Sequence, residues 1–255
     1  MRSTVRQFVF LVAVGGASVA ALAQNEQSPI DIRNENISYN AALPSLNFSY
    51  SQNTPLDVVN TGSPDEEATV KANVPAGAGS VSVSGNTYDL LQFHFHTPAE
   101  HWLNGHESEM ELHMVHRDAG GNLMVVGRWI EEGPANAALD SIFSNLPTST
   151  ADPRSIASFD LTSMLTADLY SFRYHGSLTT PPYTEGVNWV LLTQPLTMSH
   201  AQIEAFRTLF PHDNSRLPQA LNGRIVETDD PAYIPAPGAA AALALGGLFA
   251  SRRRR

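Results

Sequence analysis

The sequence contains no cysteine among its 255 residues. The chain therefore cannot draw stability from disulfides, and any metal site in it must be built from histidine and carboxylate ligands. Basic residues are also few, with 15 Lys and Arg against 25 Asp and Glu and a net charge of −10 at pH 7. Because a nucleic-acid partner requires a basic surface that neutralises phosphates, this balance argues against nucleic-acid binding.

The sequence also lacks an apolar run of the ~20 residues that an ordinary membrane-spanning helix needs. Residues 1–23 instead combine two arginines, an apolar stretch and the tripeptide Ala21-Leu22-Ala23 ahead of Gln24. This pattern is typical of a secretory signal peptide with a small-residue cleavage site. We therefore expect an exported protein.

The C-terminus reads PAPGAAAALALGGLFASRRRR, with residues 236–255 forming a short apolar segment and an arginine tail. Proline-rich start, apolar segment and basic tail together resemble the PEP-CTERM class of C-terminal sorting signals. The resemblance implies transient membrane association through the termini and processing by an exosortase-type enzyme during export in a Gram-negative-type bacterium. The expected location is therefore the periplasm, the cell surface or the outside of such a cell. The alternative is a weak membrane anchor that stays in place.

The body of the chain, residues 24–235, alternates short apolar runs with Gly, Pro and Asn turns, which indicates a single domain dominated by β-strands. The stretch 24–51 is expected to be loop-like. Two helices are predicted, at 135–145 and at 199–210, the second capped by Ser199. The predicted strands cover 56–60, 68–74, 81–83, 88–96, 109–116, 123–130, 170–174 and 187–192.

The stretch QFHFHTPAEHW, residues 92–102, alternates histidine with phenylalanine. Since successive side chains of a strand point to opposite faces, His94 and His96 share one face and the phenylalanines share the other. The same alternation in EMELHMVH, residues 109–116, presents His113 on one face. If the two strands pair, these histidines form a three-imidazole site with an open fourth position, which suits catalytic zinc. Imidazole also binds iron, copper and nickel, so the ligands alone do not name the metal.

Each of these strands also carries a polar side chain two residues ahead of a histidine, Gln92 before His94 and Glu111 before His113. A metal-binding histidine needs a hydrogen bond to its second ring nitrogen, so both side chains are predicted to orient the ligands. The alternative is that these are hydrogen-bonded structural histidines in a polar interior. The other histidines are assigned no role beyond structure or surface: His101, His106, His116, His175, His200 and His212.

A third stretch, GSLTTPPYTEGVNWV, places two threonines before two prolines. Each proline fixes its own φ, so this loop is expected to hold its hydroxyls in fixed directions. The three stretches resemble the signatures of the α-class carbonic anhydrases in order and spacing, as do QSPIDI and NSRLPQALNGR nearer the ends. The resemblance covers about residues 25–226. It implies a single mainly β domain with a large, twisted, mostly antiparallel central sheet, a few peripheral helices, and zinc at the bottom of a conical cavity.

Carried over position by position, the resemblance implies that His94, His96 and His113 bind Zn²⁺. Thr179 would accept a hydrogen bond from zinc-bound hydroxide and donate one to Glu100, which orients the hydroxide toward carbon dioxide. The implied reaction is the reversible hydration of carbon dioxide to bicarbonate and a proton. The implied substrate pocket is an apolar wall with a polar side at Thr180, lined by Val115, Val125, Leu178, Thr179, Thr180 and Trp189.

The sequence departs from the family at the position of the proton-shuttling histidine, where Ser63 follows Gly62 in VVNTGSPDEE. Serine does not titrate near neutral pH, whereas histidine, with a pKa of about 6.5, suits a proton relay. We therefore expect turnover that is limited by proton transfer and responds to added buffer. Asp65, Glu66 and His106 are the alternative proton acceptors.

Two further departures concern the loop and the start of the chain. The aromatic WGY-type segment that usually precedes QSPIDI is missing, and Tyr183 stands where many exported relatives carry a cysteine paired with an N-terminal one.

Two alternative functions stay open. A cupin-type metal protein would use HFHTPAEHWLNG as its first motif with Glu100 as a ligand, although the second cupin motif is not found. A non-catalytic surface binding protein would keep the fold, but such relatives typically lose a zinc histidine, and all three are present here.

Overall fold

The computed structural model describes residues 25–62, 68–210 and 212–234. The predicted signal peptide (1–23) and the C-terminal segment (236–255) lie outside the described residues. Within the described ranges, no helix combines the length and the apolar character that crossing a membrane requires.

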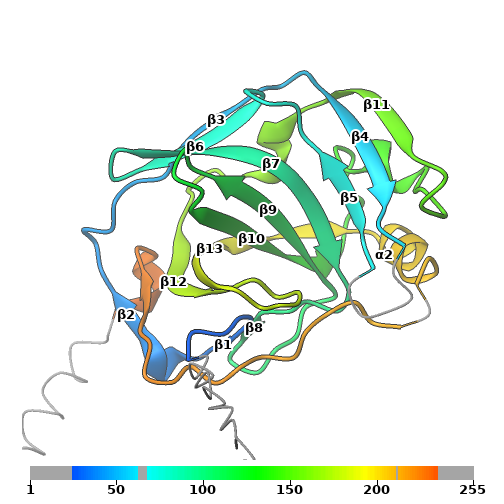
Figure 1. The fold of residues 1–255 in the computed structure, drawn as a ribbon. Coiled ribbons are helices and arrows are strands. Elements are labelled where there is room, and N and C mark those ends of the chain that lie inside the picture. The colour runs from blue at the N-terminus through cyan, green and yellow to red at the C-terminus, as the bar shows by residue number, and fades with distance from the viewer. Residues whose placement is uncertain (1–24, 63–67, 211, 235–255) are drawn as a thin grey trace, which may run out of the picture.

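In the described part of the chain, a twelve-stranded sheet forms the body of the protein (Figure 1). Its strands are β2 (Ile37–Tyr39), β3 (Asn47–Tyr50), β4 (Thr54–Asn60), β5 (Val70–Asn73), β6 (Gly79–Val83), β7 (Asn86–His96), β9 (Met110–Arg117), β10 (Leu123–Glu132), β11 (Arg154–Phe159), β12 (Ser171–Ser177), β13 (Glu185–Met198) and β14 (Val226–Thr228). Their order is β11-β4-β5-β7-β9-β10-β13-β12-β14-β2, and β3 attaches through β6, which also pairs with β7.

Most neighbouring strands of this sheet run antiparallel, while the pairs β10–β13 and β14–β2 are parallel. A separate parallel pair, β1 (Asp31–Ile32) and β8 (Trp102–Leu103), lies below the curved sheet in Figure 1. The segment after α2 (His200–Arg207) runs past this pair and back toward β2 (Figure 1). The predicted mainly β fold with a large, mostly antiparallel central sheet is confirmed.

The prediction that 24–51 is loop-like is wrong, because β1, β2 and β3 lie within it. These short strands pair with segments far along the chain, β2 with β14 and β3 with β6. Such pairing supplies the strand geometry that a sequence rich in Asn and Ser does not suggest locally. Strand β11 was also not expected. Its six residues alternate only weakly between buried and exposed, so the sequence shows no clear strand pattern there.

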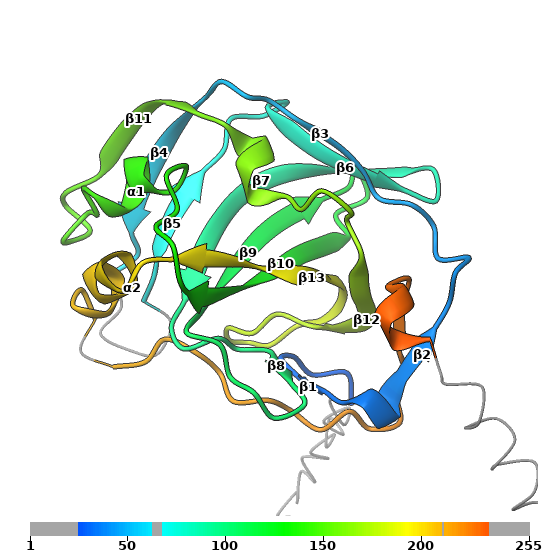
Figure 2. The ribbon, with the colours of Figure 1, turned by 180° about the vertical axis from the view of Figure 1, so that it is seen from behind.

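The two predicted helices differ in how far they form. The helix expected at 135–145 shortens to α1 (Asp140–Phe143), because the Asn136 side chain accepts a hydrogen bond from the Leu139 amide and holds the preceding residues in a turn. Helix α2 starts where predicted, with Ser199 and Gln202 forming a reciprocal capping box. Figure 2 shows α1 and α2 lying together at one end of the sheet, beside β11.

The alternation predicted for β7 and β9 separates two cores. Phe93, Phe95, Leu112 and Met114 are fully buried in the larger hydrophobic cluster, on one face of the sheet. The opposite face carries the polar residues of both strands and a second cluster centred on Trp189. The histidines therefore lie on the face that is shared with the smaller core.

Candidate metal centre

Strands β7 and β9 pair in antiparallel register and bring the three histidines together. His94 lies directly opposite His113, and His96 follows two residues later on the same face of β7. The ring centroids are 5.0 Å apart for His94 and His96, 5.3 Å for His94 and His113, and 4.6 Å for His96 and His113. One nitrogen from each ring lies within 4.8 Å of the others. The predicted strand pairing thus forms a compact cluster of three imidazoles.

Each of these imidazoles has one nitrogen held by a hydrogen bond. Nδ1 of His94 is 2.8 Å from Oε1 of Gln92, and Nε2 of His113 is 2.8 Å from Oε1 of Glu111. Nδ1 of His96 is 2.7 Å from the backbone oxygen of Asn214. Because each partner accepts a hydrogen bond, the held nitrogen carries the proton. The second nitrogen of each ring, Nε2 of His94 and His96 and Nδ1 of His113, is left free to bind a metal.

Two buried polar atoms next to this cluster have no hydrogen-bond partner among the described residues. They are Nε2 of His96 and Oε2 of Glu100, which lie 3.6 Å apart. Glu100 Oε2 is also 3.8 Å from Nδ1 of His113. Buried polar atoms in native proteins are normally satisfied, so unpaired atoms pointing at one place indicate a missing partner. A zinc ion on the three free nitrogens fits this donor set, since catalytic zinc takes three protein ligands and keeps one position open.

The environment favours neutral ligands on β7. Burial, aided by the other two histidines and by Lys71, lowers the pKa of His94 well below its usual value. Burial also lowers the pKa of His96. For His113 burial acts in the same direction, but the Glu111 carboxylate outweighs it and raises the pKa. His94 and His96 are therefore neutral at neutral pH, which is the form that binds metal.

Glu111 connects the metal cluster to a buried network. Its Oε1 also lies 2.8 Å from Nδ1 of His101, and its Oε2 accepts a hydrogen bond of 2.7 Å from the His101 amide. On the far side, Nε2 of His101 is 2.6 Å from the Tyr174 hydroxyl, which is 2.8 Å from Ser28 Oγ. The interactions with His101 and His113 outweigh burial and hold the pKa of Glu111 well below its usual value. His101, expected to be an ordinary structural residue, thus fixes the carboxylate that orients His113.

A glycine makes room for this carboxylate. Gly127 on β10 lies opposite His113 on β9, and a β-carbon at Gly127 would overlap the Leu191 side chain and sit 3.1 Å from Oε1 of Glu111. The methyl group of an alanine there would clash with Leu191 and crowd Glu111, and the densely packed interior leaves little room for either to move. Gly127 therefore keeps the orienting carboxylate of Glu111 in place.

The predicted apolar wall lies in one cluster. Val125 and Trp189 are buried members of the smaller core, and Val115 and Leu178 pack against it. Val125 pairs in register with Val115 on β9 and with Trp189 on β13, so the three lie side by side on one face. The Trp189 ring centroid is 4.9 Å from that of His113, which places the wall against the metal cluster.

The threonine loop lies between β12 and β13. Thr179 is buried and Thr180 is partly exposed, and the loop is closed by backbone hydrogen bonds from Tyr183 to Thr180 and from Leu178 to Thr184. No hydrogen bond joins Thr179 to Glu100 in this structure, so the expected bond between them is not formed. Oε1 of Glu100 accepts one from the Arg216 amide at 2.9 Å.

The sequence reasoning missed three residues near the site. Asn214 holds His96 through its backbone oxygen, and its side chain also accepts from the Thr97 amide at 2.7 Å. Arg216 holds Glu100 through its amide. Lys71 on β5 pairs with His94 and so presents a positive charge beside it. Alternation along β5 could have found Lys71, but Asn214 and Arg216 lie in an irregular segment without periodicity.

Three positions considered for proton transfer lie outside the described residues: Ser63, Asp65 and Glu66. The fourth, His106, is exposed and contacts Glu131.

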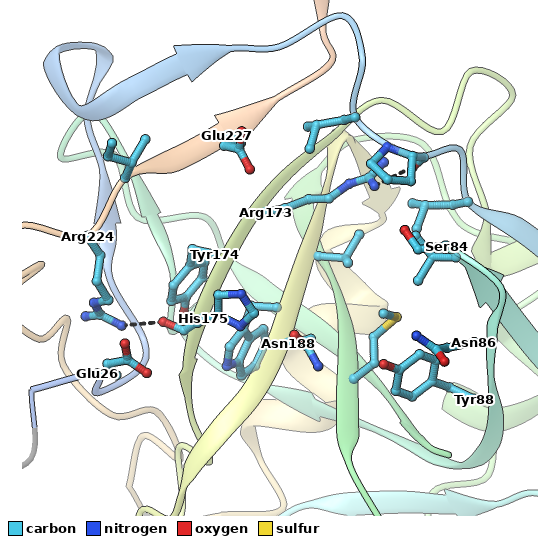
Figure 3. A pocket seen from close by; sticks show the side chains of 18 residues that line it. Glu26, Ser84, Asn86, Tyr88, Arg173, Tyr174, His175, Asn188, Arg224 and Glu227 are labelled. Carbon is cyan, nitrogen blue, oxygen red and sulfur yellow. Dashed lines mark hydrogen bonds between the residues drawn. The ribbon is translucent and has the colours of Figure 1, made fainter. Parts of the chain in front are cut away.

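A cavity of about 410 Å³ is lined by residues of β12 and β13, among them Tyr174 and Trp189 of the smaller core (Figure 3). Arg173, His175 and Asn188 line it together with Tyr88 at the end of the β6–β7 hairpin. The three clustered histidines are not among its lining residues. Arg224 at its edge donates to the backbone oxygen of His175 at 2.9 Å, the contact drawn in Figure 3.

Comparisons with known proteins agree with this geometry. The family model described as eukaryotic-type carbonic anhydrase matches residues 16–230. A carbonic anhydrase of Klebsiella pneumoniae is 36% identical over 201 residues, which cover 78% of each chain. One from Neisseria gonorrhoeae is also 36% identical, over 78% of this chain and 76% of its own.

The structural comparison points the same way. The α-carbonic anhydrase of Thermovibrio ammonificans, solved in complex with the inhibitor sulfanilamide, superposes with a TM-score of 0.73 at 36% identity. The match covers 80% of this chain and 87% of that one. These similarities contradict the alternative that the chain is a cupin-type metal protein. The chain therefore belongs to the α-class, or eukaryotic-type, carbonic anhydrase family, the enzymes that hydrate carbon dioxide.

Proposed function

We propose that this protein catalyses the reversible hydration of carbon dioxide to bicarbonate and a proton with one zinc ion held by His94, His96 and His113. The observation that supports this most is the cluster of three imidazoles, in which one nitrogen of each ring lies within 4.8 Å of the others. Such a site supplies hydroxide at neutral pH by lowering the pKa of a bound water to about 7, a figure established on carbonic anhydrases themselves and not inferred from this chain.

The protein side of this mechanism begins with ligand orientation. Gln92, Glu111 and the backbone of Asn214 each hold one imidazole by its second nitrogen. The rings are thereby fixed before the metal binds, so little reorganisation is needed. His101 supports Glu111 from behind and keeps its carboxylate charged.

Glu100 and Thr179 would direct the nucleophile. Glu100 is buried and already accepts from the Arg216 amide through Oε1, which leaves Oε2 as an acceptor. With zinc bound, the Thr179 hydroxyl would donate to Glu100 and could then only accept a hydrogen bond from the attacking oxygen. Thr179 and Glu100 would in this way orient the attacking oxygen toward the carbon of the substrate.

The substrate would lie against the apolar wall of Val115, Val125, Leu178 and Trp189, with Thr180 on the polar side. Carbon dioxide is small and uncharged, and a wall of this kind holds it without competing hydrogen bonds. Bicarbonate is charged, and it gains less from an apolar surface because its burial costs solvation. The wall therefore favours release of the product.

Proton release would be the slow step. With Ser63 at the position of the usual relay histidine, no side chain there titrates near neutral pH. Solvent buffer would then accept the proton, and turnover would rise with buffer concentration.

Export and C-terminal processing complete the proposal. The pattern of residues 1–23 supports cleavage before Gln24, and the PAPG segment with its arginine tail supports recognition by an exosortase-type enzyme in the membrane. Intact-mass measurement of the protein recovered outside the cytoplasm tests both cleavages, and full-length protein in the cytoplasm would contradict them.

The activity is tested by stopped-flow hydration of carbon dioxide, using the purified protein in saturating buffer. The wild type should hydrate carbon dioxide, and His94→Ala should lose both zinc and activity. His200→Ala is the matched control, because His200 is exposed and lies on α2 away from the cluster. Zinc bound without hydration would leave the non-catalytic binding alternative as the explanation.

A further inference from the structure

Arg216 joins three segments that are distant in the sequence: the stretch of Gln27 and Ser28, the segment of Glu100 and the loop that carries Tyr183. Its amide donates to Oε1 of Glu100 at 2.9 Å. Its guanidinium carbon lies 3.7 Å above the ring centroid of Tyr183, four residues after Thr179. Its Nη1 donates to Oε1 of Gln27 at 3.0 Å and to the backbone oxygen of Ser28 at 2.6 Å.

Gln27 closes this set of contacts from the other side. Its Nε2 lies 3.2 Å from the backbone oxygen of Tyr183 and 3.2 Å from Oε1 of Glu185. Gln27 is only 6% exposed, while Glu185 is exposed, so these hydrogen bonds are partly shielded from water. We call Gln27, Tyr183 and Arg216 the arginine bridge. It holds the threonine loop from two directions, by the ring and by the backbone of the same residue.

The conformation of Tyr183 shows that this loop is held under constraint. Its φ is +58°, in the left-handed region that a bulky side chain rarely adopts. Such a conformation costs on the order of a kcal/mol and persists where surrounding contacts determine it. The contacts that do so here are the stacking of Arg216 and the hydrogen bond from Gln27.

We propose that Arg216 and Tyr183 are positioning residues, which keep the Thr179 loop in register with Glu100. Their contacts would hold this loop to the N-terminal segment without a covalent link. The chain has no cysteine, so no disulfide holds this loop. A planar guanidinium suits the task, because it stacks on the ring while its edge donates to Gln27 and Ser28. This proposal rests on the proposed roles of Thr179 and Glu100.

The bridge is tested by Tyr183→Leu with Tyr183→Phe as the matched control. Both variants keep a non-glycine residue at the left-handed position, but only phenylalanine keeps the ring face. We expect Tyr183→Leu to lower kcat/KM for carbon dioxide roughly three- to tenfold, the loss of one partly desolvated cation–π contact, with zinc content unchanged. Tyr183→Phe should keep the wild-type kcat/KM.

Amide hydrogen exchange on the metal-free protein gives a readout that does not depend on activity. The loop amides of Leu178 and Tyr183 donate to Thr184 and Thr180 at 2.9 Å. Their exchange should accelerate in Tyr183→Leu and stay at the wild-type rate in Tyr183→Phe. Unchanged exchange and unchanged kcat/KM in Tyr183→Leu would overturn the proposal.

The double variant Tyr183→Leu with Thr179→Ala separates this proposal from the proposed function. If the bridge acts through Thr179, adding Tyr183→Leu to Thr179→Ala should lower kcat/KM no further, since interacting residues are non-additive. Additive losses would mean that Tyr183 acts elsewhere and would contradict the bridge. If Thr179→Ala alone leaves kcat/KM unchanged, the role of Thr179 in the proposed function is wrong, and loop exchange still decides whether the bridge holds the loop.

Discussion

Glu111 holds His113 through a hydrogen bond of 2.8 Å between Oε1 and Nε2, although both side chains project from the same strand two residues apart. The strand brings the ligand and its orienting group together as one unit. The carboxylate stays ionised because His101 and His113 outweigh the effect of burial on its pKa. A charged acceptor makes the imidazole a stronger metal ligand than a neutral acceptor would.

Glu111→Gln is therefore expected to weaken zinc binding by about 10- to 100-fold, the usual cost of losing such a partner. The amide keeps the shape of the side chain but cannot accept from both His101 and His113 with full charge. Competition with a chromogenic chelator measures the zinc affinity. The exposed Glu107→Gln serves as the control and should match the wild type, and equal affinity in both variants would show that Glu111 does not support the ligand.

Glu100→Gln should lower kcat/KM by on the order of a hundredfold or more while zinc stays bound. The Arg216 amide needs an acceptor, so the glutamine oxygen would face it and the NH₂ group would take the place of Oε2. The Thr179 hydroxyl could then no longer donate to this side chain. Stopped-flow kinetics with zinc analysis of the same sample checks this, and full activity in the variant would remove Glu100 from the mechanism.

The buried pair of His116 and Tyr50 predicts a pH effect on stability, away from the metal. Tyr50 Oη lies 2.6 Å from Nε2 of His116, and burial lowers the pKa of His116 to about 4. In the unfolded chain the pKa of this histidine is about 6.5. Between that pH and about 4, the unfolded state therefore binds a proton that the folded state does not bind. Stability from this residue is thus lost as the pH falls from about 6.5 to 4.

His116→Gln should remove this sensitivity, because glutamine does not titrate. Between pH 7 and pH 5 the wild type should lose about 2 kcal/mol more of its unfolding free energy than the variant does. Urea unfolding at both pH values gives the comparison, with His200→Gln as an exposed control. A wild type and a His116→Gln variant with the same pH dependence would show that His116 is accessible to protons in the folded state.

Ser63→His tests the proposed limit on turnover. At low buffer concentration this variant should turn over faster than the wild type, because histidine titrates near neutral pH and can relay the proton. At high buffer concentration the two should converge. Ser63→Ala is the control and should behave as the wild type does, and a wild-type rate that does not respond to buffer would refute the limit itself.

Much of the site follows from local periodicity. The alternation in residues 88–96 and 109–116 predicts which side chains share a face, and the pairing of β7 with β9 brings His94 opposite His113 as expected. Gln92 and Glu111 follow from the same pattern, since each lies on the face of its ligand. These features were predictable because a strand has a fixed period of two.

The rest depends on contacts between distant segments. Asn214 and Arg216 reach His96 and Glu100 from an irregular stretch more than a hundred residues away, as the separations of 118 and 116 show. No periodicity marks such residues. The short strands β1, β2 and β3 were missed for the same reason, because their partners and not their composition make them strands.

Zinc-dependent catalysis is tested most directly by titrating zinc into chelator-treated protein and following carbon dioxide hydration in the same sample. We predict that the rate rises linearly with added zinc and stops rising at one zinc per chain, and that His113→Ala shows neither binding nor rate. Hydration that persists in the fully zinc-free protein, or zinc that binds at one per chain without any hydration, would contradict the central claim.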